Sequence, residues 1–201
     1  TNDQSQVWVS NTGSGTISVI DTSSNTVVDT ISVGGAPRAV IFTADDSIGY
    51  VLNSTLNTVQ AVTTATMAVT GAGSAFTPAD GLLSADENSL FFTGVGGMDR
   101  IVRVDLLTGT FDYNETVALP DGGRAEELRW SPDGTEMWAT VHAESSQYVA
   151  VLNTTATQVL ATIPVDGLPQ GFTFSADGDL VYVTEYTSDR VAVIDASTRQ
   201  V

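Results

Sequence analysis

The chain has 201 residues, of which 42% are hydrophobic and 15% charged, a composition typical of one globular domain with its own core. Asp and Glu number 24 against seven basic residues, all of them Arg, so the net charge of −17 repels nucleic-acid phosphates and anionic membranes. There is no Cys for disulfides or thiolate sites, and no apolar run approaches the length of a membrane span. We therefore expect no nucleic-acid partner and no membrane insertion.

Short strands separated by tight turns fill the chain. The first group alternates apolar with polar residues, as half-buried antiparallel strands do, and its turns are made of Gly, Ser, Asn and Thr. Four similar groups follow. The predicted strands are 7–11, 16–21 and 26–33; 38–43, 50–53, 58–63 and 67–70; 79–84, 90–93, 100–105 and 110–119; 125–131, 137–141, 148–153 and 158–164; and 170–175, 180–185 and 190–195, with the start of one more before residue 201.

The groups repeat at a nearly constant spacing. The residues that close equivalent strands lie 42, 42, 48 and 42 positions apart; they are Asp21, Thr63, Asp105, Asn153 and Asp195. A period of about 42 residues built from strands and turns, without a helical stretch, predicts an all-β propeller of four-stranded antiparallel blades. The predicted blades are 7–33, 37–70, 78–119, 125–164 and 169–201, the first and last being partial.

Two recurrent features support this interpretation. The turns after the first strand of each blade read TADD, SADE, SPDG and SADG, where Asp accepts local backbone hydrogen bonds and Gly takes a positive φ. We interpret these aspartates as turn formers and not as metal ligands. Large apolar residues recur once per blade, as packing between adjacent blades requires. They are Trp8, Tyr50, Phe91, Trp138 and Tyr182 in one strand position, and Phe42, Leu83, Trp130 and Phe174 in another.

The amino-acid sequence of the repeat also resembles that of a known family. The segments VWVSN and VYVTE, followed by VIDTSSNTVVDTISVGGAPR and by FSADG, are similar to the YVTN-type β-propeller repeat of archaeal and bacterial surface-layer proteins. The resemblance covers nearly the whole chain and is strongest in the first and fifth copies. It implies four-stranded blades around a central channel. It leaves function open, because such repeats occur in structural, binding and enzymatic proteins.

The phase of the strands predicts an open arc of about four and a half repeats, of the kind that belongs to a seven-bladed ring. The first blade lacks its innermost strand and the last lacks most of its outermost one, so the two partial sets overlap instead of completing one blade. The alternative is a complete five-bladed ring whose first blade has no inner strand. In an open arc, unpaired blade edges favour self-association.

The starts of the inner strands line the central channel of a propeller at one face, and they carry carboxylates here. Asp80, Glu126 and Glu127 occupy these positions, and Glu185 stands where Asn11 and Asn53 end the corresponding strands. Oxygen ligands of this kind suit a cation such as Ca²⁺ or a ligand at the channel mouth. The alternative is a set of solvated carboxylates on an acidic surface. No other cofactor is expected.

His142 is the only histidine, near Glu144. A haem, copper or zinc site needs more imidazole or thiolate than this chain offers, so we expect an exposed loop histidine, with a general-base role as the alternative. Neither a GxSxG elbow nor a GxGxxG phosphate loop is present. Three N-x-S/T sequons are candidate N-glycosylation sites if the protein is secreted. They begin at Asn53, Asn114 and Asn153.

Three classes of function remain. The first is a non-catalytic module at the cell surface or outside the cell, or in the periplasm, with protein or glycan partners; the acidity and the absence of catalytic constellations favour it. The second is the propeller scaffold of an enzyme, either a lactonase-like hydrolase or a quinone- or haem-dependent oxidoreductase. The third is an intracellular scaffold for protein–protein contacts.

Overall fold

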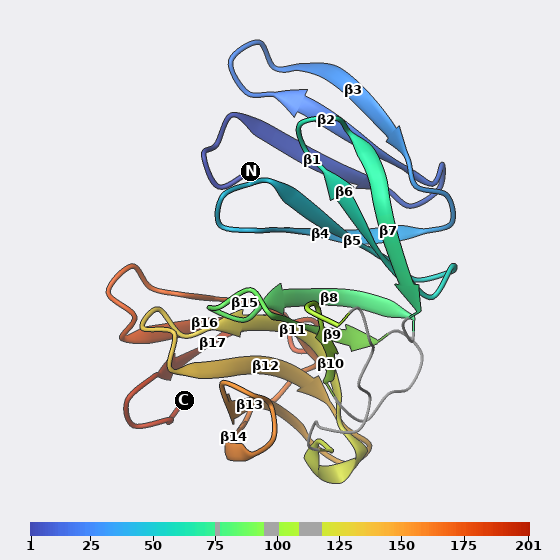
Figure 1. Cartoon of the computed structure of the whole chain (residues 1–201). Helices are drawn as coiled ribbons and strands as arrows, with labels where there is room; N and C mark the ends of the chain where they lie inside the picture. Colours follow the sequence, from blue (N-terminus) through green and yellow to red (C-terminus); the bar gives the residue numbers. More distant parts are fainter. Residues whose placement is uncertain (75–76, 95–100, 109–117) are drawn as a thin grey trace.

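The computed structural model describes residues 1–74, 77–94, 101–108 and 118–201. These residues form strands, turns and one short 3₁₀ turn, η1 (Pro120–Gly122), so the all-β prediction is confirmed for them. No helix among them is long and apolar enough to cross a membrane. Every strand pair is antiparallel, and the strands form five separate sheets that follow one another along the chain (Figure 1).

The sheets are numbered here in chain order. Sheet 1 is β1 (Gln6–Asn11), β2 (Thr16–Asp21) and β3 (Thr26–Ser32); sheet 2 is β4 (Pro37–Phe42), β5 (Ile48–Asn53), β6 (Thr58–Thr63) and β7 (Ala68–Ser74). Sheet 3 is β8 (Pro78–Leu83), β9 (Ser89–Gly94) and β10 (Val102–Asp105). Sheet 4 is β11 (Arg124–Trp130), β12 (Glu136–His142), β13 (Gln147–Asn153) and β14 (Val159–Pro164); sheet 5 is β15 (Pro169–Phe174), β16 (Leu180–Glu185) and β17 (Arg190–Asp195).

Sheets 2 and 4 have the four strands that the repeat predicts, and sheets 1 and 5 have three each. The fourth strand predicted for sheet 3, at 110–119, falls almost entirely outside the described residues. In sheet 5 the residue after the last turn, Gln200, makes only an isolated bridge to Asp195.

Each turn after an inner strand is closed by its aspartate, which confirms their interpretation as turn formers. The carboxylate of Asp45, for example, accepts the Thr43 hydroxyl at 2.7 Å and the Ser47 amide at 2.9 Å. Asp86, Asp133 and Asp177 repeat this pair of bonds. The residue after the aspartate has a positive φ in every case, which is why Gly is favoured there. These residues are Asp46, Glu87, Gly134 and Gly178.

An aromatic contact recurs between consecutive sheets at three places. A ring from β1, β9 or β12 meets, nearly edge to face, a ring that ends the inner strand of the next sheet. The pairs are Trp8–Phe42 at 5.1 Å, Phe91–Trp130 at 6.1 Å and Trp138–Phe174 at 5.4 Å between ring centroids. Four apolar clusters, one for each pair of consecutive sheets, form the core. The prediction that the recurrent large apolar residues pack between sheets needs correction for Tyr182, which is 38% exposed, whereas Trp130 and Phe174 are partly buried against the clusters.

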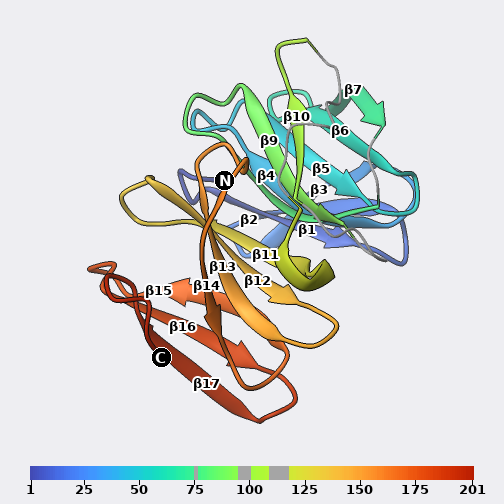
Figure 2. The same cartoon turned by 90° about the horizontal axis from the view of Figure 1, so that it is seen from below.

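The five sheets do not close into a ring. The apolar clusters join sheet 1 to 2, 2 to 3, 3 to 4 and 4 to 5, and none in the described part of the chain joins 5 to 1. Figures 1 and 2 show the blue sheet 1 and the red sheet 5 away from each other. Each of these sheets has one outward face with exposed apolar residues, Val7, Val9 and Val27 in sheet 1 and Tyr182, Val191 and Val193 in sheet 5.

Candidate functional site

The inner strands of sheets 3, 4 and 5 share a bulge near their first residues. The pairing with the second strand shifts between Pro78 and Gly81, between Ala125 and Leu128, and between Pro169 and Phe172. A bulge takes backbone groups out of the ladder and re-aims side chains. Three of the four acidic residues that the sequence singled out lie in two of these bulges: Asp80, Glu126 and Glu127.

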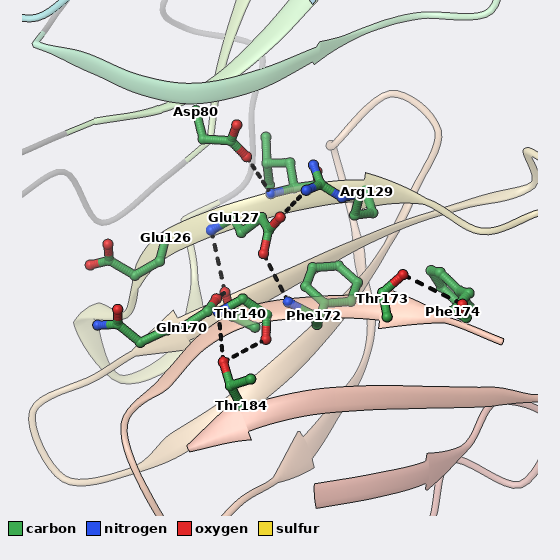
Figure 3. Close-up of polar contacts among 12 residues, drawn as sticks. Asp80, Glu126, Glu127, Arg129, Thr140, Gln170, Phe172, Thr173, Phe174 and Thr184 are labelled. Carbon is green, nitrogen blue, oxygen red and sulfur yellow. Dashed lines mark hydrogen bonds and ion pairs between the residues drawn. The ribbon is translucent and has the colours of Figure 1, made fainter. Parts of the chain in front are cut away.

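Two carboxylates use this position to bind backbone amides of the following sheet (Figure 3). Asp80 Oδ2 accepts the Leu128 amide at 3.0 Å, and Glu127 Oε2 accepts the Phe172 amide at 2.8 Å. Glu127 also forms an ion pair with Arg129. Each carboxylate therefore ties its sheet to the next one and satisfies an amide that the bulge leaves unpaired.

Threonines of the second strands complete the same contact. The hydroxyl oxygens of Thr93 and Thr140 accept the amides of Asp80 at 3.1 Å and Glu127 at 3.3 Å. The Thr140 hydroxyl donates in turn to the Gln170 carbonyl at 2.7 Å, in the next sheet (Figure 3). Sequence reasoning missed these threonines, although their recurrence one residue after the buried apolar position of the second strand is a readable signal.

Asp80 has the clearest electrostatic perturbation at this place. Burial, the largest cause, raises its pKa above the usual value of 3.8, while the hydrogen bond from Leu128 and the charge of Arg129 act in the opposite direction. The carboxyl group of Asp80 therefore keeps its proton to a higher pH than a solvated aspartate does.

An open hollow of about 310 Å³, which we call the inner hollow, lies over these residues. It is lined by Asp80, Glu126, Glu127, Gln170 and Gly171, so three of the four residues predicted for the channel mouth come together. Two of the three already bind backbone amides, and no group of three or more His, Cys, Asp or Glu that could hold a metal ion occurs among the described residues. The prediction of a Ca²⁺ site gains no support from this geometry.

Glu185 does not line the inner hollow, which corrects the prediction that it joins the channel mouth. It is buried, and its two oxygens accept the Asp166 amide at 3.0 Å and the Ser188 hydroxyl at 2.8 Å. Asn53, at the matching place in sheet 2, accepts the Ala36 amide at 3.0 Å. Both side chains close the loop that precedes their own inner strand, so the Glu at position 185 takes over the role of the Asn.

A second hollow of about 270 Å³, which we call the rim hollow, shares Glu126 with the first. Its other lining residues include Arg124, His142, Glu144 and Gln147. Arg124 and His142 face each other across β11 and β12, and the bulge brings Glu126 to the same place. The side-chain oxygen of Gln147 is buried and has no hydrogen-bond partner among the residues that the structure describes.

His142 is held by two acceptors. Its Nε2 lies 2.7 Å from the Pro169 carbonyl oxygen, and its Nδ1 lies 3.3 Å from Glu126 Oε1. A carbonyl oxygen only accepts hydrogen bonds, so Nε2 carries a hydrogen. His142 is the last residue of β12, and it is partly buried. The expectation of an exposed loop histidine is therefore wrong. The carboxylate beside it is Glu126, and not Glu144 as the sequence indicated.

A larger hollow, of about 510 Å³, lies at the opposite ends of the strands, between the turns of sheets 3 and 4. Its lining includes Phe91, Trp130 and Pro132. It contains none of the residues predicted to form the channel-mouth site, so its size alone does not make it the candidate site.

Two of the three sequons have a described asparagine. Asn53 is fully buried, and its amide nitrogen donates to the Gly34 carbonyl at 2.8 Å and to Gln60 at 3.2 Å. A glycan on that nitrogen is incompatible with this packing, so Asn53 is removed from the glycosylation candidates. Asn153 is partly exposed, with its amide nitrogen 2.9 Å from the Thr157 hydroxyl, and Asn114 lies outside the described residues.

Comparison with known proteins identifies the fold but no family. No protein-family model and no curated protein sequence matches the chain. Many solved structures are similar to it, among them the following two. One is the hydrazine synthase of Kuenenia stuttgartiensis, with a TM-score of 0.66 and 18% identity over 97% of this chain and 74% of the other. The second is the dihydro-heme d1 dehydrogenase NirN in complex with DHE, with a TM-score of 0.76 and 14% identity.

The likeness to NirN covers the whole of this chain but only 44% of that protein. Identities this low establish a shared fold and nothing about activity. The chain therefore has the antiparallel, propeller-like fold that the repeat predicts.

Proposed function

We propose that the chain is the propeller scaffold of an enzyme and that its substrate binds in the rim hollow. The observation that carries the proposal is the contact between His142 and Glu126 at the edge of that hollow. The two similar structures are enzymes by name, which supports the enzyme scaffold over a non-catalytic role. The chain spans less than half of one of them, so partner domains are part of the proposal.

The pair is suited to moving a proton. The Nε2 hydrogen of His142 is donated to the Pro169 carbonyl. The short distance between Nδ1 and Glu126 Oε1 is therefore favourable when the two atoms share one proton. The bond to Pro169 fixes the ring, and Glu126 is the partner exposed toward both hollows. A positioned proton donor of this kind typically contributes about 10²–10⁴-fold to a reaction rate.

The lining of the rim hollow indicates the substrate class. Arg124 offers a guanidinium for a carboxylate or another anionic group of the substrate. A cation for the carboxylate and a pair that moves a proton suit the hydrolysis of a small carboxylated ester or lactone. Water attacks the carbonyl carbon, the bond to the leaving oxygen breaks, and the Glu126–His142 pair takes the water proton and delivers one to the leaving oxygen.

The alternative of a haem enzyme fits these residues poorly. The name of NirN states a complex with DHE, and His and Cys are common axial ligands of a haem iron, beside Met and Tyr. The only histidine of this chain has both ring nitrogens engaged, and the chain has no cysteine. We therefore derive no step through a haem.

The experiment is a hydrolysis assay on a panel of small esters and lactones with and without a carboxylate. We expect Glu126→Gln and His142→Gln to lower kcat/KM by about 10²-fold or more. Glu144→Gln, a matched change in the same hollow, should have less than a tenfold effect. Equal activity of Glu126→Gln and the unsubstituted protein, with unchanged Tm, would refute the proposal.

A second candidate function is a non-catalytic binding module outside the cell, at the cell surface or in the periplasm. The net charge of −17 favours it. Its partners would be proteins or glycans. If no substrate in the panel is hydrolysed while glycan or protein arrays give saturable binding, the second function replaces the first.

A further inference from the structure

The hollow of about 510 Å³ between sheets 3 and 4 takes no part in the proposed function. We call it the turn hollow, because the turns that follow the inner strands of both sheets border it. Its volume is within the range of small-molecule sites. None of the described residues lines both the turn hollow and either of the two hollows at the other ends of the strands. Its lining includes Ser89, Phe91, Arg103, Trp130 and Pro132.

Arg103 departs from the repeat at this place. It lies on the third strand of sheet 3, directly opposite the recurrent ring of the second strand, Phe91. The residues opposite that ring in the other four sheets are all small and apolar: Val19, Ala61, Val151 and Val193. Val19 and Val151 are fully buried against the next sheet. A charged side chain thus replaces part of an apolar contact between sheets, and such local breaks of a pattern are typical of functional positions.

A buried serine holds this arginine. The hydroxyl oxygen of Ser89, which is 4% exposed, accepts the Nε hydrogen of Arg103 at 2.9 Å. The matching residues of sheets 1 and 4, Gln6 and Glu136, accept the indole hydrogen of a tryptophan instead. Sheet 3 has Phe91 at the place of that tryptophan, and a phenyl ring has no hydrogen to donate. The acceptor and the ring differ together in sheet 3, and the serine serves the arginine.

Two aromatic rings border the same hollow. The centroids of Phe91 and Trp130 lie 6.1 Å apart, with the ring planes at 87°. The indole N–H of Trp130 donates to the Leu83 carbonyl at 2.7 Å, which fixes the orientation of the indole. Trp130 is only partly buried, and Pro132 follows it in the turn. A further aromatic ring packs well on such a lining, either edge to face or offset.

We propose that the turn hollow binds a small aromatic carboxylate. The ring of the ligand packs against Trp130 and Pro132, and its carboxylate accepts hydrogen bonds from the guanidinium of Arg103. The planar fork of an arginine matches the two oxygens of a carboxylate, and these charge-assisted bonds are stronger than bonds between neutral groups. Asp86, the one acidic residue in the described lining, accepts hydrogen bonds from Ser84 and Asn88 within its own turn.

Isothermal titration calorimetry with 2-naphthoate tests this proposal. We expect saturable binding of one 2-naphthoate per chain. Binding of 2-naphthalenemethanol, which lacks the carboxylate, and of cyclohexanecarboxylate, which lacks the aromatic ring, should be at least about tenfold weaker. Arg103→Val introduces the residue of sheets 1, 4 and 5, and it should weaken 2-naphthoate binding at least about tenfold. Arg103→Gln serves if the Tm of Arg103→Val shows that it is poorly folded. Arg190→Gln removes an arginine whose side chain is 68% exposed, and it should bind like the unsubstituted protein.

A second arginine decides where the ligand sits. Arg124 lines the rim hollow, so a carboxylate bound there would depend on Arg124 and not on Arg103. We expect Arg124→Gln to leave 2-naphthoate binding unchanged, whether or not the rim hollow hydrolyses esters. The absence of saturable binding at millimolar 2-naphthoate would overturn the proposal. So would equal binding of 2-naphthalenemethanol, unchanged binding in a folded Arg103 variant, or loss of binding in Arg124→Gln.

Discussion

Removing the carboxylate of Asp80 tests how the sheets are held together at their inner strands. In Asp80→Ala the Leu128 amide loses its carboxylate acceptor, while in Asp80→Asn an amide oxygen remains at the same place. Both variants remove the partly buried charge, so their difference isolates the hydrogen bond. An amide left unpaired away from water costs about 1–3 kcal/mol, and we expect Asp80→Ala to be less stable than Asp80→Asn by this amount.

The raised pKa of Asp80 predicts how the stability of Asp80→Asn relative to the unsubstituted protein changes with pH. Burial raises the pKa of Asp80 above 3.8, so the folded chain binds this proton more tightly than the unfolded chain. The stability that the protonated group contributes is fully present below pH 3.8 and is lost as the pH rises through the raised pKa. At pH 7, Asp80→Asn should therefore be at least as stable as the unsubstituted protein, and any advantage should vanish near pH 4.

Urea denaturation followed by tryptophan fluorescence, at pH 7 and at pH 4, measures these differences. For a chain of this size, each kcal/mol corresponds to about 2–4 °C in Tm, so calorimetry provides an independent check. Equal stability of Asp80→Ala and Asp80→Asn at pH 7 would show that the bond to Leu128 does not hold sheets 3 and 4 together. A strong loss in Asp80→Asn that persists at both pH values would refute the assigned role of burial.

Four further predictions follow from the described contacts. Hydrogen bonds from Ser47 and Thr43 lower the pKa of Asp45 to about 2, so its stabilising effect is present above pH 3.8 and is lost as the pH falls through about 2; Asp45→Asn should flatten the acid limb of a stability–pH curve. Trp130→Ala should cost about 3 kcal/mol, through the lost contact with Phe91 and a lost bond to a backbone carbonyl, and a loss below about 1 kcal/mol in denaturant melts would show that the indole is not part of the interface. Asn53→Ala should cost about 2–3 kcal/mol because it leaves buried backbone groups unpaired, and intact-mass analysis of protein from a glycosylating host should find no glycan at this position. Tm should rise with NaCl from low to physiological levels, since salt screens repulsion among 24 acidic residues; a constant Tm would indicate that they are already paired.

The fold was readable from the sequence because its causes are local and repeated. The aspartate of each inner turn bonds to residues within two positions of itself, so TADD and its three relatives predict their turns without knowledge of the rest of the chain. The recurrence of one large apolar residue per repeat predicts which face meets the next sheet. Sheet packing at Trp8–Phe42 and Trp138–Phe174 follows that pattern.

The roles of the acidic residues were not readable in the same way. Asp80 and Glu127 resemble free carboxylates in the sequence, and their amide partners lie 48 and 45 residues away. Only the bulges and the stacking of the sheets bring these groups together. His142 is a similar case, because Glu126 and Pro169 reach it from two other strands while the neighbouring Glu144 does not.

The sequence by itself determined the period, the strands, the turns and the alternation of buried and exposed faces, since each depends on residues within one repeat. The tertiary structure decided which carboxylates are bound to backbone amides, which asparagines are buried and which end faces stay exposed. These properties depend on how one repeat sits against the next, and the free energy of a charge or an apolar side chain is set by the neighbours that this stacking gives it.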